Sequence, residues 1–341
     1  MNTKEERRRE KWKRTVFDDR DSAKLLLVDF PAEARDRPAL HLDTTAERIE
    51  WAWRKYEAQQ SRLDRLEDDR VPYLDCLTGT EIFAAAFGCE VQYPDDTNPF
   101  AKPLVDSPDA ADALSEPSLD APTLAQAFEI ADELTSRAGD DAVTRLPDIQ
   151  SPMDIAGIVW DKNDFFVSAI EQPGAVLRLA EKTRSLLTRF LDEWFRRYGR
   201  SFVAHYPDYY MDHGITLSED EIGSVGPDVF DSLFLPELDY LSRRYDGIGI
   251  HCCAHARHQW NGMLKVPGLR VLNLNQSPDV LAEALPLFSD AAVQLPIPSP
   301  WPGSGDATPP LEGVPAIFSV PVDTEDDAKR VVEAFRREWG G

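Results

Sequence analysis

The chain has 341 residues, 42% of them hydrophobic, and a formal net charge of −24 at pH 7. A charge of this sign repels phosphate backbones and anionic lipid headgroups, so we expect neither a nucleic-acid partner nor a membrane partner. No apolar stretch is long enough to span a bilayer or follows the basic opening residues as a signal peptide would, which predicts a cytoplasmic protein with reduced cysteines.

The first part of the chain, residues 1–69, is predicted to be a helical extension that packs on the outside of a later core. It opens with the basic segment MNTKEERRREKWKR. Further on, Ile49, Trp53, Tyr56 and Leu63 recur at roughly helical spacing. This spacing predicts an amphipathic helix that ends shortly before residue 69.

Residues 70–341 are predicted to form one α/β domain, because short apolar runs alternate there with amphipathic segments. The predicted strands are Val71 to Leu74, Ser201 to Tyr206, Gly247 to Cys252, Leu269 to Leu274, Ala291 to Leu295 and Ala316 to Val320. The predicted helices include Thr80 to Phe87, Leu124 to Arg137, Pro173 to Tyr198, Pro227 to Tyr245, Ser277 to Leu287 and Thr324 to Trp339. No GxGxxG motif opens a helix, which favours a (β/α)8 TIM-type barrel over a dinucleotide-binding sheet.

The stretch GIGIHCCAHARHQ, residues 247–259, is the densest group of metal-binding residue types in the chain. Strand alternation places His251 and Cys253 on one side and Cys252 on the other, in the barrel wall. A His-x-Cys pair offers one imidazole and one thiolate to a zinc ion. No cysteine follows Cys253, so a further ligand would be His255, His258, an acid or a residue from an earlier strand. The alternative is that His251 makes an ordinary hydrogen bond to substrate or backbone.

Two further segments place polar residues near the ends of predicted strands. Asp75 ends the strand in VPYLDC, where it is either catalytic or a turn-forming residue. His205 lies late in its strand, and an acidic loop with Glu219, Asp220 and Glu221 follows. The alternative for the acidic loop is a solvated surface. Three aromatic residues after His205 are either pocket wall or core: Tyr206, Tyr209 and Tyr210.

From about Arg70 to Gln276, the order of these pieces resembles the uroporphyrinogen decarboxylase superfamily. That superfamily includes the decarboxylase itself and zinc-dependent methyltransferases that act on corrinoid proteins. The resemblance rests on VPYLDCLTGTEIFAAAFGCEV, on PDIQSPMDIAGIVWD, on LSEDEIGSVGPDVFDSLFLPELDYL, on the strand that ends in IHCC and on VPGLRVLNLN. It implies a (β/α)8 barrel with a deep cleft at its C-terminal face.

The resemblance also assigns expected roles. Asp75 falls where the decarboxylase keeps the aspartate that faces its substrate. His251 and Cys253 fall where the methyltransferases keep their first two zinc ligands, and Asp220 matches an acidic residue that enters the cleft. The methyltransferases have a late cysteine as third ligand, for which Ser319, a poor zinc ligand, is the nearest candidate here.

The chain departs from the decarboxylase at two places. Ile158 stands where that enzyme has its active-site tyrosine, and the arginine-rich N-terminal signature that binds propionate groups is missing. An anionic tetrapyrrole needs such an arginine cluster. We therefore do not expect porphyrin decarboxylation.

The resulting hypothesis is a methyltransferase-type enzyme that acts on a small substrate in the barrel mouth, with a corrinoid protein as its partner. His251 and Cys253 bind zinc or the substrate directly, Asp75 and Asp220 orient groups or move protons, and His205 lines the pocket. One alternative is a metal-independent decarboxylase or lyase that acts on a small carboxylate, with Asp75 as general acid and His251 as base. Another is a barrel that has lost its chemistry and binds a ligand.

Overall fold

The computed structural model describes residues 3–18, 23–31, 35–94, 97–299 and 311–340. Its larger sheet has six strands, in the spatial order β1, β12, β11, β10, β9 and β8, and all neighbours pair in parallel. These strands are β1 (Lys24–Asp29), β8 (Ile215–Ser218), β9 (Ile248–Cys252), β10 (Leu269–Asn275), β11 (Val293–Ile297) and β12 (Ala316–Pro321). The prolines of PIPSPWPGSGDATPP, residues 296–310, predict a loop, of which residues 300–310 lie outside the described residues.

A second sheet has the order β2, β5, β6 and β7, with an antiparallel pair at its β6–β7 edge. Its strands are β2 (Tyr73–Leu74), β5 (Val143–Arg145), β6 (Phe202–Val203) and β7 (Tyr210–Met211), and a separate hairpin joins β3 (Val91–Gln92) to β4 (Phe100–Ala101). Two backbone links connect the two sheets. Gln150 bridges Ser218 at the end of β8, and the Asp69 N–H donates to the Leu26 carbonyl of β1 over 2.8 Å.

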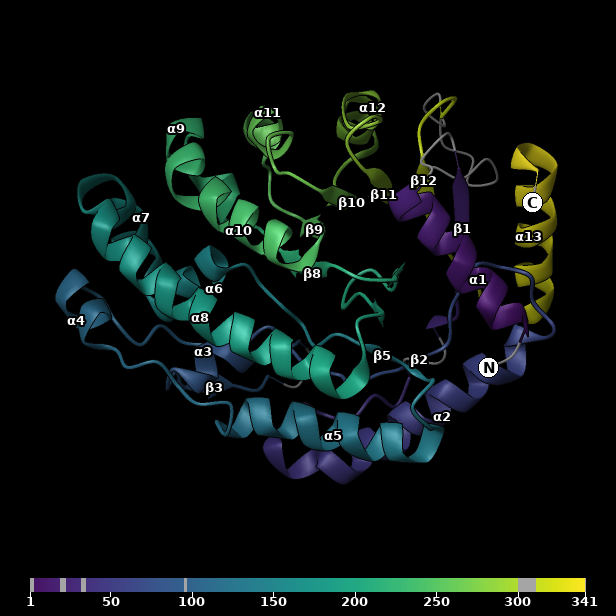
Figure 1. Cartoon of the computed structure of the whole chain (residues 1–341), viewed down its shortest axis with the longest axis horizontal. Helices are drawn as coiled ribbons and strands as arrows, with labels where there is room; N and C mark the ends of the chain where they lie inside the picture. The colour runs from purple at the N-terminus through teal and green to yellow at the C-terminus, as the bar shows by residue number, and fades with distance from the viewer. Residues whose placement is uncertain (1–2, 19–22, 32–34, 95–96, 300–310, 341) are drawn as a thin grey trace.

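With these links, eight strands are spatial neighbours in ring order, as in a (β/α)8 fold. They are β1, β2, β5, β8, β9, β10, β11 and β12. Helices surround the strands on the outside (Figure 1). The longer ones are α1 (Thr3–Lys13), α2 (Thr45–Leu63), α5 (Pro122–Ala138), α7 (Lys162–Glu171), α8 (Pro173–Tyr198), α10 (Leu235–Tyr245), α12 (Pro278–Leu287) and α13 (Glu325–Trp339). Shorter ones are α3 (Ile82–Ala86), α4 (Pro108–Ala113), α6 (Pro152–Val159), α9 (Pro227–Val229) and α11 (Trp260–Met263). None of the described helices is long and apolar enough to cross a membrane.

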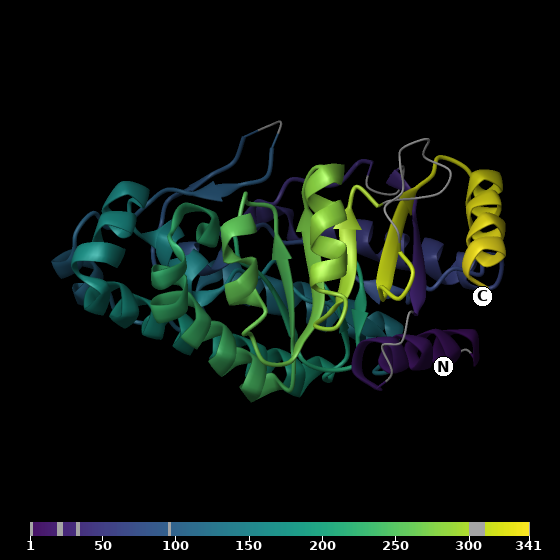
Figure 2. The same cartoon turned by 90° about the horizontal axis from the view of Figure 1, so that it is seen from above.

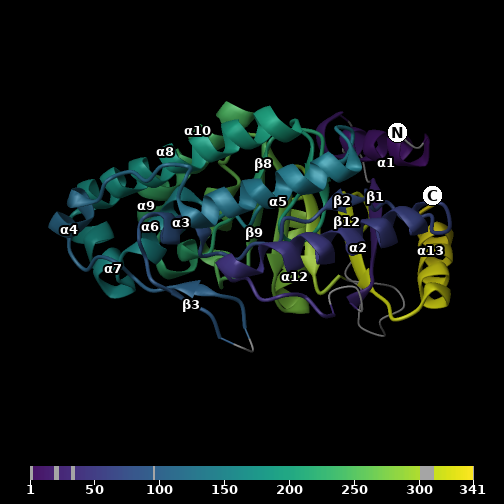
Figure 3. The ribbon, with the colours of Figure 1, turned by 90° about the horizontal axis from the view of Figure 1, so that it is seen from below.

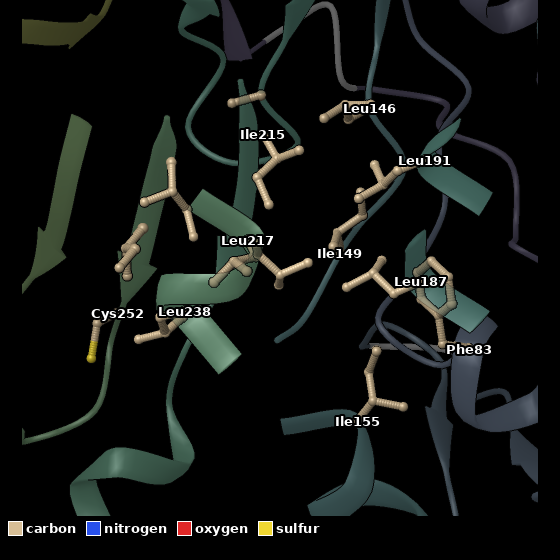
Figure 4. Packing of buried hydrophobic residues seen from close by; sticks show 14 of the residues in the cluster. Phe83, Leu146, Ile149, Ile155, Leu187, Leu191, Ile215, Leu217, Leu238 and Cys252 are labelled. Carbon is tan, nitrogen blue, oxygen red and sulfur yellow. The ribbon is translucent and has the colours of Figure 1, made fainter. Parts of the chain in front are cut away.

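Helix α8 shows how the sequence specifies one of these elements. Pro173 occupies its first turn, where a missing N–H costs nothing, and Gly199 follows its end with a positive φ of 85°. Leu187, Leu191 and Trp194 recur every three or four residues and are fully buried. Figure 4 shows the side chains of Leu187 and Leu191 packed near Phe83, on the inner side of the helix.

Two neighbouring cysteines at the end of strand β9 lie in different surroundings, one in the buried barrel wall and one at the exposed mouth. Cys252, with no exposed surface, belongs to the same buried cluster as Leu217 of β8 and Leu238 of α10 (Figure 4). Cys253, the next residue, is exposed. The predicted strand register, with Cys252 in the barrel wall, is therefore confirmed.

The strands run with their C-terminal ends toward one side of the molecule, and α1 lies at the opposite side (Figures 2 and 3). The Trp12 indole N–H of α1 donates to the Asp69 carbonyl over 2.7 Å, just before β2. Phe17 stacks on His213, which precedes β8, with 3.8 Å between ring centroids. Helix α1 and the turn after it therefore cover the N-terminal end of the barrel.

The structure corrects one prediction about residues 1–69. Helices α1 and α2 fit the predicted helical extension, but Lys24–Asp29 forms strand β1, which pairs in parallel with β12. The helical prediction is wrong over these residues, because the short run Leu25 to Val28 is buried as part of the sheet. A run of four apolar residues carries no periodicity by which to tell a strand from a helix.

Candidate functional site

Three side chains of types that can ligate a metal ion meet at the C-terminal ends of β8 and β9. They are Asp220, two residues after β8, His251 within β9, and Cys253 directly after it. Their potential ligand atoms all lie within 4.8 Å of one another. Ligands about 2.0 to 2.3 Å from one tetrahedral zinc ion lie about 3 to 4 Å apart, so a small closure would bring these atoms to zinc geometry.

Asp220 is held in place by two sets of hydrogen bonds. The carboxylate of Asp154, in α6, accepts from the backbone N–H groups of Asp220 and Glu221 over 2.7 and 3.0 Å. The carboxylate of Asp220 in turn accepts from the N–H groups of Cys253 and Ala254 over 2.6 and 3.2 Å. These bonds fix the Asp220 carboxylate against the loop that carries Cys253.

The thiol of Cys253 donates to Asp220 Oδ2 over 3.3 Å. Partial burial, and then the negative charge of Asp220, raise the pKa of Cys253 to about 11. Cys253 is therefore a protonated thiol at neutral pH in the metal-free protein. A metal ion that binds there would have to displace this proton.

His251 is buried, and Asn273 of β10 fixes its orientation. The Asn273 side-chain N–H donates to the Leu295 carbonyl over 2.5 Å, so its amide oxygen faces the imidazole. That oxygen can only accept, which places the hydrogen of the neutral ring on His251 Nδ1. The lone pair of Nε2 is then free for a metal ion or a substrate proton.

His205 and Asp148 form a second polar group beside the first. His205 Nε2 lies 3.1 Å from Ser218 Oγ and 3.5 Å from Asp148 Oδ1, and Ser218 is the register neighbour of His251. Burial first, and then the neighbouring His251 and Arg145, lowers the pKa of His205 well below its usual value. His205 is therefore neutral, and its buried Nδ1 has no hydrogen-bond partner. Burial raises the pKa of Asp148 to about 6.

Asp75 is not part of the metal-binding group. Its side chain is 1% exposed and lies 2.6 Å from Lys55 Nζ and 3.0 Å from Arg145 Nη1. Burial alone would raise the pKa of Asp75, but the charges and hydrogen bonds of Arg145 and Lys55 outweigh burial and lower it. Asp75 is thus a permanently ionised partner of two cations, and these contacts do not suit a general acid.

A cavity of about 650 Å³ is lined by the C-terminal ends of β1, β11 and β12 and by residues 206–208, and none of the three clustered residues lines it. Tyr206 lines it, and the Tyr206 ring packs edge-on against His251 with 5.0 Å between centroids. The other two tyrosines of this segment, Tyr209 and Tyr210, are buried. Ser319 also lines the cavity, but its hydroxyl donates to Asp29 and lies outside the clustered group.

The remaining ligand candidates lie elsewhere. His258 Nε2 is 2.9 Å from the Val225 carbonyl, and neither His255 nor His258 belongs to the clustered group. Several residues that shape the site were missed in the sequence: Lys55, Arg145, Asp148, Asp154 and Asn273. A signal existed for Asn273, since it is a polar residue in the middle of strand LRVLNLN, between Leu272 and Leu274.

A circuit of parallel strands with His, Cys and Asp gathered at its C-terminal ends defines a (β/α)8 protein with a candidate metal site in the mouth. The family model of uroporphyrinogen decarboxylase (URO-D) matches residues 57–294, and the chain belongs to this family. In fold it is similar to a methyltransferase from Methanosarcina mazei, with a TM-score of 0.63, 12% identity and 86% of each chain covered. No curated protein matches the sequence at a significant level.

Proposed function

We propose that this protein is a zinc-dependent enzyme of the methyltransferase type, with Asp220, His251 and Cys253 as the metal ligands. The observation that carries the proposal is the approach of their ligand atoms to within 4.8 Å of one another. Catalytic zinc sites use three protein ligands from His, Cys and Asp or Glu and leave a fourth position for water or substrate. Asp220 thus takes the place that the missing late cysteine leaves open.

A zinc ion held there would lower the pKa of a substrate thiol and make its thiolate available as a nucleophile. The chain's own residues prepare this site. Asn273 keeps His251 Nε2 free of a hydrogen, and Asp154 holds the backbone that carries Asp220. A small substrate would occupy the cavity beside Tyr206, and a corrinoid protein would supply the methyl group at the open mouth.

The metal-independent decarboxylase has less support. That reaction needs Asp75 to donate a proton, whereas Lys55 and Arg145 keep its carboxylate ionised. His251 as its base meets no such objection, since Nε2 has a free lone pair. Methyl transfer uses neither residue as an acid, and it is therefore the reaction that we favour.

Metal binding is the first test. Protein freed of metal should take up one equivalent of Zn²⁺, and Co²⁺ in its place should give the absorption of a thiolate ligand. Cys253→Ala should lose both, whereas Cys252→Ala, its neighbour in the barrel wall, is the matched control and should keep both. A wild-type protein without stoichiometric zinc, or a Cys253→Ala variant that retains it, would overturn the proposal.

Methyl transfer is the second test. Zinc-loaded protein should accelerate demethylation of methylcobalamin by a small thiol and form the methyl thioether, and Cys253→Ala should not. Zinc and thiol binding without any turnover would overturn methyl transfer and favour the barrel that only binds a ligand. Release of carbon dioxide from a small carboxylate, without zinc, would instead favour the decarboxylase.

A further inference from the structure

Carboxylates and cations are unequally exposed around the mouth cavity. Asp29 and Asp208 line the cavity, with 32% and 25% of their side chains exposed. The nearby cations are more deeply placed: Arg70 is 11% exposed, Lys55 15% and Arg145 18%. No lysine or arginine is among the described residues that line the cavity. The cavity therefore presents carboxylate oxygens, with the cations behind them.

Each of these cations is already engaged by a carboxylate. Arg70 contacts both Asp29 and Asp208, the latter at 3.6 Å. Arg145 contacts Asp208 at 3.3 Å and Asp75 at 3.0 Å, and Lys55 contacts Asp75 at 2.6 Å. An incoming anion would thus have to displace an existing ion pair to reach any of these three cations.

Asp148 adds a further carboxylate near the metal-binding group. Its side chain is 26% exposed, and its nearest partners are the amide of Gln150 at 2.8 Å and the imidazole of His205 at 3.5 Å. Both partners are neutral. Ser218 contacts His205 and is the register neighbour of His251, which places this carboxylate in the polar group next to His251, with the charges of Arg145 and Arg37 also acting on it.

The rest of the cavity wall suits the apolar and cationic parts of a ligand. Tyr206 is 42% exposed, and the face of an aromatic ring attracts ammonium groups. The other lining residues are mostly apolar: Pro207, Ile297, Pro298, Val320 and Pro321. Tyr206 also contacts His251, so this ring connects the cavity to the clustered group.

We propose that the substrate is a small aminothiol, bound by its sulfur at the metal site and by its ammonium group between Tyr206 and Asp208. This proposal rests on the proposed function for the sulfur end only. A thiol with a carboxylate or sulfonate at its far end would place that charge beside Asp29 and Asp208 and is disfavoured. Specificity of this kind arises as much from repulsion of the wrong charge as from attraction of the right one.

The test compares three thiols of similar size in calorimetric titrations of the zinc-loaded protein. They are 2-aminoethanethiol, which is cationic, 2-mercaptoethanol, which is neutral, and 3-mercaptopropionate, which is anionic. The wild-type protein should bind 2-aminoethanethiol about tenfold more tightly than 3-mercaptopropionate. Because the thiols differ in intrinsic acidity, the decisive quantity is the change of this ratio in variants.

Tyr206→Leu and Asp208→Asn should each lower the ratio about threefold or more. Tyr240→Leu is the matched control, because this tyrosine is 40% exposed on α10, outside the cavity lining, and should leave the ratio unchanged. Asp208 also anchors Arg145, so Tyr206→Leu, which breaks no ion pair, keeps the test independent of folding. A ratio that stays unchanged in Tyr206→Leu, or a wild-type preference for the anionic thiol, would overturn the aminothiol while zinc binding stands. A protein that binds no zinc would overturn both proposals.

Discussion

The two ends of the barrel use their buried acids in different ways. At the end covered by α1, Asp69 accepts from Lys11 over 2.7 Å and from the Leu26 N–H over 2.8 Å. Asp68 next to it pairs with Arg8 at 3.2 Å. At the mouth, Asp220 accepts hydrogen bonds from two backbone N–H groups and from a thiol. Among the residues that the structure describes, no cation forms a hydrogen bond with it.

This difference separates acids that hold the fold together from acids that remain available to a ligand. At the covered end, carboxylates complete hydrogen bonds that strand β1 lacks and bind the first helix to the barrel. At the mouth, Asp220 is instead held by backbone N–H groups, with no described cation among its hydrogen-bond partners. Acids of the second kind are the ones expected at a metal or substrate site.

The largest effect is expected at the covered end, on stability. Trp12 is 1% exposed and its indole bonds to the Asp69 carbonyl. Trp12→Ala should lower the free energy of unfolding by about 3 to 5 kcal/mol, because it removes a large buried side chain and a hydrogen bond. Urea denaturation followed by tryptophan fluorescence and circular dichroism measures this change.

Cys253→Ser at the exposed mouth is the contrasting variant and should change stability by about 0.5 kcal/mol or less. Trp12→Ala should also leave zinc affinity unchanged under conditions in which it is folded. Equal destabilisation by the two variants would show that the ends do not differ as described.

A second effect is expected on metal affinity at the mouth. Asn273→Ala should weaken zinc binding about 10- to 100-fold, because the ring of His251 loses the acceptor that fixes its tautomer and orientation. Competition with a chromophoric zinc chelator measures this affinity. Asn275→Ala, an exposed position two residues later in β10, is the control and should bind zinc like the wild type. An unchanged affinity in Asn273→Ala would contradict the role given to this side chain.

The smallest effect concerns the reactivity of the Cys253 thiol and its dependence on pH. With a pKa of about 11, metal-free Cys253 should react slowly with iodoacetamide at pH 8, and the rate should rise about tenfold per pH unit until that pKa is approached. Asp220→Asn removes one cause of the raised pKa, so the profile should shift to lower pH and the rate at pH 8 should increase several-fold. Mass spectrometry of the labelled protein follows the reaction.

Labelling should be confined to Cys253, because the other three cysteines are buried. Bound zinc should suppress it. A pH profile that is the same in Asp220→Asn and the wild type would show that Asp220 does not control this thiol.

Features that depend on local periodicity could be predicted from the order of residues along the chain. Helix α8 begins and ends at the predicted residues, since proline and glycine mark its ends and its apolar positions repeat every three or four residues. Strand alternation was enough to predict that Cys252 lies in the barrel wall and that the side chains of His251 and Cys253 lie near each other on the other side of the strand. The superfamily resemblance, which the URO-D match over 57–294 supports, rested on motifs of the same local kind.

Which distant residues meet could not be predicted in this way, because it depends on how the strands and helices pack. Asp220 joins His251 and Cys253 in the clustered group because β8 and β9 are neighbours in parallel register, with Ser218 beside His251. Asp75, an expected catalytic residue, instead meets Lys55 from a helix and Arg145 from another strand. A residue's own neighbours in the chain set its direction, but its charge state and partners depend on long-range packing, which no local pattern encodes.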